Sequence, residues 1–99
     1  MLILALDPGD RLTSWVLYDS EKQALCGHDT QPNEKLLIRV RTDDFPRVAD
    51  HLACEMVACY GMPVGRTIFE TCLWIGRFVE AWDGPHSLVY RLDVKMHLC

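Results

Sequence analysis

The sequence predicts an α/β fold in which helices pack against a mixed β-sheet. Three successive apolar or alternating segments with tight links open the chain, and this pattern is typical of an antiparallel meander. The remainder alternates helix with strand, which gives the order β-β-β-α-β-α-β. The 99 residues contain no internal repeat and no linker, and this indicates a single domain.

Each element follows from its periodicity and its turn residues. Strands are expected at residues 2–6, 13–19, 23–30, 51–58 and 87–94, and helices at 34–41 and 65–82. Asn33 is the expected N-cap of the first helix, and Gly84-Pro85 ends the second. The expected apolar side of the second helix, widened by two phenylalanines, consists of Ile68, Phe69, Cys72, Ile75, Phe78, Val79 and Trp82.

Composition narrows the class of protein. The formal net charge of −4 speaks mildly against nucleic acid as a partner without excluding it. The sequence has no apolar run of membrane-spanning length and no signal-peptide pattern, so we expect a cytoplasmic protein without a membrane partner.

The five cysteines show no CxxC spacing, and we expect reduced, mostly buried thiols. A zinc site from His51, Cys54 and Cys59 lacks an obvious fourth ligand, and we disfavour it.

Two carboxylates occupy positions that are unusual for a core. Asp7 closes the first apolar strand, and Glu55 interrupts the fourth between apolar neighbours on both sides. A buried carboxylate is costly unless it meets a cation or a metal ion. The alternative for Asp7 is a turn aspartate that caps the Pro8-Gly9 backbone. The alternative for Glu55 is a solvent-facing residue of an edge strand.

The two carboxylates point to one site if their strands are neighbours. The carboxyl ends of adjacent parallel strands lie together, so Asp7 and Glu55 would meet at one point of the sheet. Paired carboxylates provide the hard oxygen ligands that Mg²⁺ prefers. Such ions activate water and stabilise the leaving oxygen in phosphodiester hydrolysis.

The sequence resembles the RuvC-like Holliday-junction resolvases of the RNase H-like superfamily, and most closely their short phage and prophage versions. The resemblance spans essentially the whole chain and rests on "LILALDPG", "TSWVLYD", "GH" before a helix, and "ACEMVACYGMPVGRTIFETCLWIGRF". It implies a five-stranded mixed sheet whose first three strands are antiparallel, flanked by helices. Asp7 and Glu55 match the first two metal-binding acids of the family, and would be both catalytic and metal-binding.

The activity implied by the resemblance is structure-selective cleavage of branched or duplex DNA, in DNA recombination, by a dimer that depends on Mg²⁺ or Mn²⁺. The helix at 65–82 takes the place of the family's dimer helix, and Leu73 and Trp74 are the candidate contacts. Weaker candidates for DNA contact are Arg11, Tyr60, Arg66, Arg77 and Lys95, each of which has an ordinary surface role as its alternative.

The sequence departs from the family at its end. The remaining family acids lie on a helix after the last strand, whereas this sequence stops at Cys99. Asp93 is the nearest acid, but it does not match the motif and is more typical of a strand-end surface residue. We therefore expect a C-terminally truncated domain with weakened metal binding, and whether it is an enzyme is left open. The alternative is a non-catalytic relative that dimerises or binds DNA; an actin-like nucleotide-binding fragment has no room in 99 residues.

Overall fold

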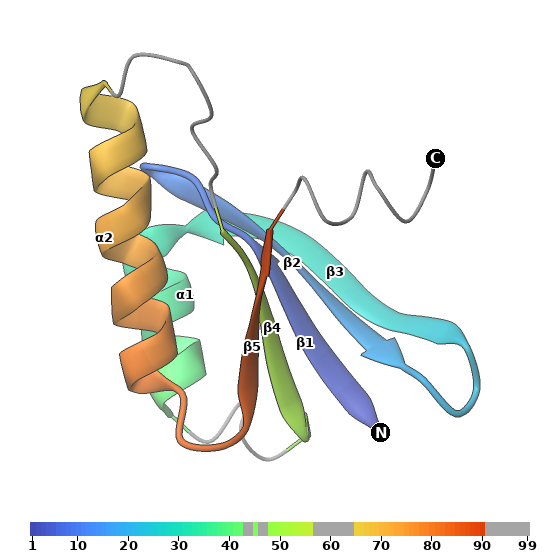
Figure 1. The fold of residues 1–99 in the computed structure, drawn as a ribbon. Coiled ribbons are helices and arrows are strands. Elements are labelled where there is room, and N and C mark those ends of the chain that lie inside the picture. Colours follow the sequence, from blue (N-terminus) through green and yellow to red (C-terminus); the bar gives the residue numbers. More distant parts are fainter. Residues whose placement is uncertain (43–44, 46–47, 57–64, 91–99) are drawn as a thin grey trace.

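The chain folds around one mixed sheet of five strands (Figure 1). The computed structural model describes residues 1–42, 45, 48–56 and 65–90. Its elements are β1 (Leu2–Asp7), β2 (Leu12–Asp19), β3 (Ala24–Pro32), α1 (Asn33–Arg41), β4 (His51–Met56), α2 (Arg66–Ala81) and β5 (His86–Tyr90). The strand order is β3-β2-β1-β4-β5. The β1–β2 and β2–β3 pairs are antiparallel, whereas β1–β4 and β4–β5 are parallel. The predicted fold class is confirmed.

The core lies between the sheet and the two helices, which Figure 1 shows on one side of the sheet. Alternation along β1 and β4 directs Leu4, Leu6, Leu52 and Cys54 toward the helices, where they are buried. Leu36 and Val40 of α1 and Phe78 of α2 complete the centre of this layer. Within the described residues, no helix covers the opposite face, which we call the open face.

The apolar face of α2 differs from the expected one. Phe78 is fully buried, and Thr71, Ile75 and Trp82 are buried around it, whereas Phe69 is 61% exposed. At ~100° per residue the buried side lies roughly 50° around the helix from the predicted side. The prediction that Phe69 widens the core face is therefore wrong. The contacts with α1 and β4, rather than the apolar pattern of α2 alone, set how the helix is rotated.

The start of α1 also differs from its prediction. The helix begins at Asn33, and the preceding Pro32 takes the N-cap position without a side-chain cap. Asn33 is not the N-cap but a fully buried helical residue. The predicted bounds of α2 are right to within one residue at each end. The expected continuations of β4 at residues 57–58 and of β5 at 91–94 lie outside the described residues.

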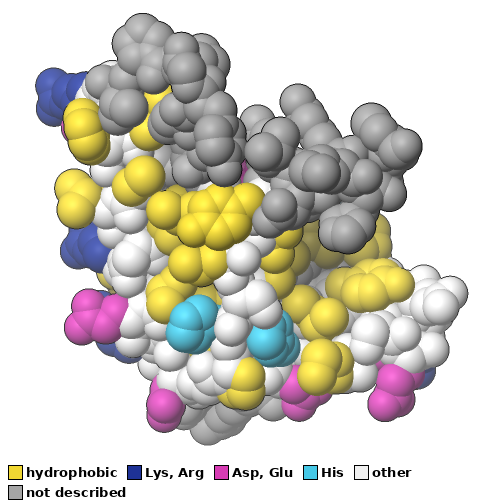
Figure 2. Space-filling view, in the orientation of Figure 1, with side chains coloured by type: hydrophobic (Ala, Val, Ile, Leu, Met, Phe, Trp, Pro, Cys, Tyr) yellow, Lys and Arg dark blue, Asp and Glu magenta, His cyan; other side chains and the backbone are white. Residues whose placement is uncertain are grey.

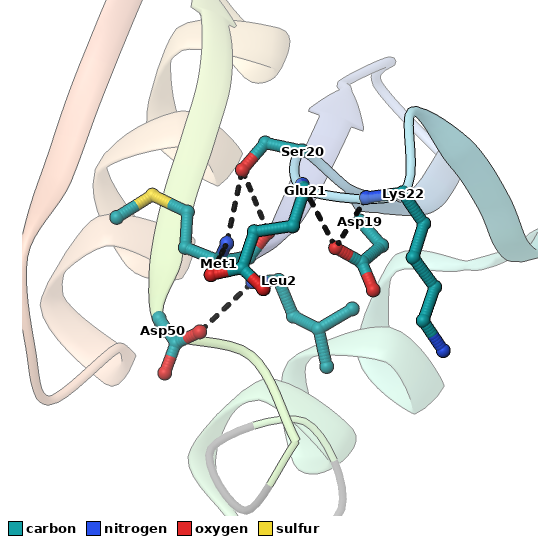
Figure 3. Close-up of polar contacts among 7 residues, drawn as sticks. All are labelled: Met1, Leu2, Asp19, Ser20, Glu21, Lys22 and Asp50. Carbon is teal, nitrogen blue, oxygen red and sulfur yellow. Dashed lines mark hydrogen bonds and ion pairs between the residues drawn. The ribbon is translucent and has the colours of Figure 1, made fainter.

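Polar contacts hold together the end of the sheet at which β1 begins and β2 turns into β3 (Figure 3). The carboxylate of Asp19 accepts hydrogen bonds from the backbone N–H groups of Glu21 at 3.0 Å and Lys22 at 3.3 Å. The Leu2 N–H donates to Oδ2 of Asp50 at 2.8 Å. The first contact closes the β2–β3 turn, and the second ties the entry of β4 to β1.

The three cysteines that the structure describes are free thiols, and they are less buried than expected. Cys54 is buried and Cys72 half-buried, whereas Cys26 is exposed because it lies on β3 at the edge of the sheet. Cys59 and Cys99 lie outside the described residues. Among the helices that the structure describes, none is both long and apolar enough to cross a membrane.

Candidate metal centre on the open sheet face

Asp7 and Glu55 are neighbours on the open face. The parallel pairing of β1 with β4 aligns Ala5 with Ala53 and Leu6 with Cys54. One further step along both strands places Asp7 beside Glu55. Adjacent strands lie about 4.8 Å apart, and both carboxylates line the same hollow at this end of the sheet. The predicted pairing of the first and fourth strands is confirmed.

The sequence produces this placement through its alternation. Leu4 and Leu6 face the helices, and Asp7 therefore faces the opposite way; Cys54 and Glu55 are related in the same manner. β4 lies between β1 and β5, so the interpretation of Glu55 as an edge-strand residue is wrong. Glu55 is half-buried and Asp7 is exposed, which leaves both carboxylates within reach of solvent.

A hollow of about 520 Å³ adjoins the two carboxylates. Alanines at positions 5 and 53 form its floor, and their small side chains leave room above the sheet. The full lining consists of Ala5, Leu6, Asp7, Ser14, Val16, Ala53, Glu55 and Val89. The volume is within the range of small-molecule and substrate sites.

The turn that follows Asp7 is held from α1. Asn33 Nδ2 donates to the carbonyl of Gly9 at 2.9 Å, and the Asn33 backbone N–H donates to the carbonyl of Arg11 at 2.9 Å. A Cβ on Gly9 would lie 2.5 Å from the Leu12 carbonyl oxygen, so this close approach requires glycine. Thr13 Oγ1 donates to Asn33 Oδ1 at 2.6 Å. Asn33 therefore holds the turn at the end of β1 in place. The sequence did not reveal this role, because its pattern predicts Asn33 as the helix N-cap.

The negative charges of Asp7 and Glu55 both affect the pKa of the same side chain, the Cys54 thiol. Burial raises the pKa of the Cys54 thiol to about 12, and the negative charges of Glu55 and then Asp7 contribute to the same shift. Cys54 precedes Glu55 on β4 and is aligned with Leu6, the residue before Asp7, so the two negative charges act on its thiol from the opposite face of the sheet.

The donor set fits a hard cation. Two carboxylates beside a solvent-accessible hollow can hold Mg²⁺ or Mn²⁺, with water completing the coordination. Within the described ranges, no group of three or more His, Cys, Asp or Glu side chains is arranged to hold a metal ion. The centre that the described residues provide is therefore a two-carboxylate site.

The predicted DNA-contacting arginines lie in different places. Arg11 is exposed in the turn that follows Asp7 and lies four residues after it in the sequence. Arg66 begins α2, and its Nε donates to Oε1 of Glu70 at 2.7 Å. Arg77 is exposed on α2, with its guanidinium 4.3 Å from the Trp74 ring centroid. The structure brings none of these three arginines together, and their contacts with DNA remain predictions. Tyr60, Asp93 and Lys95 lie outside the described residues.

The candidate dimer contacts lie on the outer side of α2. Leu73 is 69% exposed. Trp74 is half-buried between Phe78, at a ring-centroid distance of 5.8 Å, and the guanidinium of Arg77. Figure 2 shows hydrophobic side chains between basic and acidic ones along the edge where α2 lies. Leu73 is thus available to a partner, whereas Trp74 also belongs to the margin of the core.

Comparison with known proteins supports the fold. No protein-family model and no curated protein matches the sequence. Among solved structures, the chain is similar to RuvC of Thermus thermophilus, with a TM-score of 0.74 and 14% identity over 97% of this chain and 68% of that one. It is also similar to T. thermophilus RuvC in complex with a Holliday junction substrate, with a TM-score of 0.72 and 15% identity over 100% of this chain and 70% of that one. The chain therefore has a RuvC-like, RNase H-like fold.

Proposed function

We propose that this chain is a metal-dependent, structure-selective DNA endonuclease domain that cleaves branched DNA of the Holliday-junction type. The observation that carries the proposal is the pairing of Asp7 with Glu55 on the open face. The similarity to a RuvC solved with a Holliday junction substrate supports DNA as the class of substrate. The resemblance to short phage and prophage resolvases supports the same assignment.

The carboxylates of Asp7 and Glu55 would hold Mg²⁺ or Mn²⁺. When bound, the metal ion supplies Lewis-acid polarisation of a phosphate oxygen and lowers the pKa of a coordinated water. Asp7 and Glu55 fix where that chemistry occurs, since their strands are hydrogen-bonded to each other. Asn33 and Gly9 hold the turn after Asp7 in place, and this limits the freedom of the carboxylate to leave the site.

Exposed arginines that follow β1 and β4 in the sequence support DNA binding. Arg11 lies four residues after Asp7, in the β1–β2 turn, and Arg66 begins α2, the helix that comes after β4 in the sequence. Arg11 is exposed and is the candidate for contact with a phosphate beside the metal centre, whereas Arg66 is a weaker candidate because its guanidinium already pairs with Glu70. Tyr60 and Lys95 lie outside the described residues, and they are proposed contacts because Tyr60 follows Glu55 closely in the sequence and Lys95 carries a positive charge.

A homodimer through α2 is part of the proposal. Phe69, Leu73 and Gly76 lie at i, i+4 and i+7 on the outer side of the helix. Arg66 and Glu80 each lie seven residues from Leu73, so they face each other when two copies pair antiparallel about Leu73. The same pairing brings Phe69 near Gly76, where a Cβ would meet nothing within 4 Å. An exposed apolar stripe with complementary charges at its ends is suited to a second copy of itself.

The second candidate function is DNA binding or dimerisation without cleavage. The two-carboxylate composition of the centre, as far as the described residues extend, favours it, because fewer ligands lower metal affinity and weaken the activation of water. The two candidates share the fold, the metal centre and the substrate class. They differ in whether phosphodiester bonds are broken.

A cleavage assay separates the two candidates. A labelled four-way DNA junction is incubated with Mg²⁺ and the wild-type chain, Asp7→Asn, or Asp83→Asn as a matched control on the exposed α2–β5 connection. Cleavage that is lost in Asp7→Asn and kept in Asp83→Asn supports the nuclease. Junction binding without cleavage by the wild type supports the second candidate. Equal cleavage by wild type and Asp7→Asn would contradict the proposed site.

A further inference from the structure

A second hollow continues the first across the open face. It has a volume of about 460 Å³ and lies over β2 and β3. Ser14 and Val16 line both hollows, so the two are adjacent. The second hollow is also lined by Trp15, Leu25, His28, Asp29 and Thr30. A molecule bound at the metal centre therefore has a path along the sheet toward the β3 edge.

The register of the strands orders this path. Asp7 is aligned with Ser14, and Ser14 with Thr30. Two strand spacings separate Asp7 from Thr30, roughly 10 Å in all. Val16 and His28 form the next aligned pair on the same face, because side chains two residues apart share a face. The row therefore runs from a carboxylate site to a neutral, hydroxyl-bearing one.

The hydroxyls of Ser14 and Thr30 form a paired donor site. Their oxygens lie 2.8 Å apart, so one hydroxyl donates to the other. The accepting hydroxyl keeps its own hydrogen for an outside acceptor. Thr30 and His28 are both exposed, and the imidazole adds a further polar nitrogen beside the pair. Hydroxyl and imidazole groups are common donors to phosphate and sugar oxygens.

The rest of this hollow suits a base rather than a second cation. Val16 and the 64% exposed Leu25 supply apolar surface on which a planar ring can lie. Asp29 is aligned with Trp15 on the opposite face, and its Oδ1 accepts the Thr30 backbone N–H at 2.8 Å. Among the residues that line the second hollow, Asp29 alone is a carboxylate, and it lies at a position of the opposite face.

We propose that the β2–β3 hollow binds the nucleotide next to the scissile phosphate of the DNA strand held at the Asp7–Glu55 centre. Ser14, Thr30 and His28 contact its phosphate and sugar oxygens, and Val16 and Leu25 contact its base. The proposal rests on the proposed function, since the metal centre defines where the scissile phosphate lies. It assigns positioning and substrate-binding roles to residues that the sequence alone did not single out.

The test measures junction binding and metal binding separately. Binding of a fluorescent four-way junction is followed by anisotropy in Ca²⁺, and Mg²⁺ binding to the chain alone by calorimetry. Thr30→Val keeps the β-branched shape and removes the hydroxyl, and His28→Ala removes the imidazole. Each is expected to weaken junction binding about five- to tenfold, as the loss of one or two hydrogen bonds does, and to leave Mg²⁺ binding unchanged. Cys26→Ala, at an exposed position of β3 outside the hollow, is the matched control.

The possible outcomes separate the proposal of a nucleotide-binding hollow from the proposed nuclease function on which it rests. Junction binding and Mg²⁺ binding that are both normal in Thr30→Val and His28→Ala overturn the nucleotide hollow and leave the metal centre standing. A wild-type chain that binds no junction overturns both. As a second measurement, the Thr30 methyl and His28 ring NMR signals of the wild type should shift on titration with the junction. Signals that stay fixed while DNA binds elsewhere contradict the inference without any substitution.

Discussion

Thr13 and Asn33 form a fully buried hydrogen bond, with Thr13 Oγ1 donating to Asn33 Oδ1 at 2.6 Å. The bond joins the start of β2 to the first residue of α1. The amide nitrogen of the same Asn33 side chain donates to Gly9 in the turn that follows Asp7. A single side chain thus connects the helix layer with the strand end that carries the candidate metal ligand.

Replacing Asn33 by alanine should destabilise the chain markedly. Asn33→Ala leaves the Thr13 hydroxyl and the Gly9 carbonyl without their partner, and we expect a loss of about 2–3 kcal/mol in the free energy of unfolding. Urea denaturation followed by circular dichroism measures this loss. Glu34→Ala, at the next and exposed position of α1, should change stability by less than about 0.5 kcal/mol. Equal stability of the two variants would show that the Asn33 contacts do not hold the turn.

Much of the fold could be predicted because its signals are local. The apolar run that ends at Asp7 and the apolar run around Glu55 each indicate one strand, and a strand that follows a helical crossover pairs in parallel. Once that pairing is assumed, the position of Glu55 beside Asp7 follows from counting along the strands. The sequence alone was therefore enough to predict that the two carboxylates of the candidate metal centre are neighbours.

The rest depends on contacts between elements that the sequence does not order. The sequence pattern around Asn33 is the same whether its side chain caps the helix or is buried. Only the position of the β1–β2 turn next to the helix start shows that Asn33 is buried. The rotation of α2, which exposes Phe69, depends on which of its sides meets α1 and β4. The Ser14–Thr30 pair requires the register of β2 on β3, and a bulge between Leu17 and Tyr18 shifts that register along the strand.

Glu55 should be necessary for divalent metal binding. Removing one of two carboxylate ligands weakens both the coordination and the negative potential of the site, so we expect Glu55→Gln to lower Mg²⁺ affinity at least about tenfold, or about 1.4 kcal/mol. Isothermal calorimetry on the full chain measures the affinity. Glu80→Gln, an exposed glutamate of α2, is the control for net charge. Mg²⁺ affinity that falls equally in both variants would indicate general charge attraction and not a site.

The Cys54 thiol should make the fold sensitive to alkaline pH. Its pKa is raised from an ordinary 9.0 to about 12 in the folded chain, so the unfolded chain loses this proton at lower pH than the folded chain does. Stability is therefore complete below about pH 9 and falls as the pH rises toward 12, by about 1.4 kcal/mol per pH unit at most. Urea midpoints between pH 8 and 11 measure the slope, and Cys54→Ala should flatten it. A slope that is unchanged in Cys54→Ala would assign the effect to other groups.

The outer side of α2 should control the oligomeric state. Leu73→Glu places a charge at the centre of the proposed antiparallel pair, and we expect it to convert a dimer into a monomer in analytical ultracentrifugation. Leu12 of β2 is also exposed, and β2 packs chiefly against β1 and β3, so Leu12→Glu is the matched control and should leave the dimer intact. A wild-type chain that remains a monomer at high concentration contradicts the α2 interface.

A charge exchange at the ends of the same pair tests its antiparallel register. Arg66→Glu should weaken the dimer, because the introduced carboxylate would then face Glu80 of the second copy. The double variant Arg66→Glu with Glu80→Arg restores an opposite-charge pair across the twofold axis and should recover the dimer. Arg66 also pairs with Glu70 within its own helix, at 2.7 Å, so circular dichroism must show that the helix content of each variant is unchanged. A double variant that remains as weakly associated as Arg66→Glu contradicts the antiparallel register.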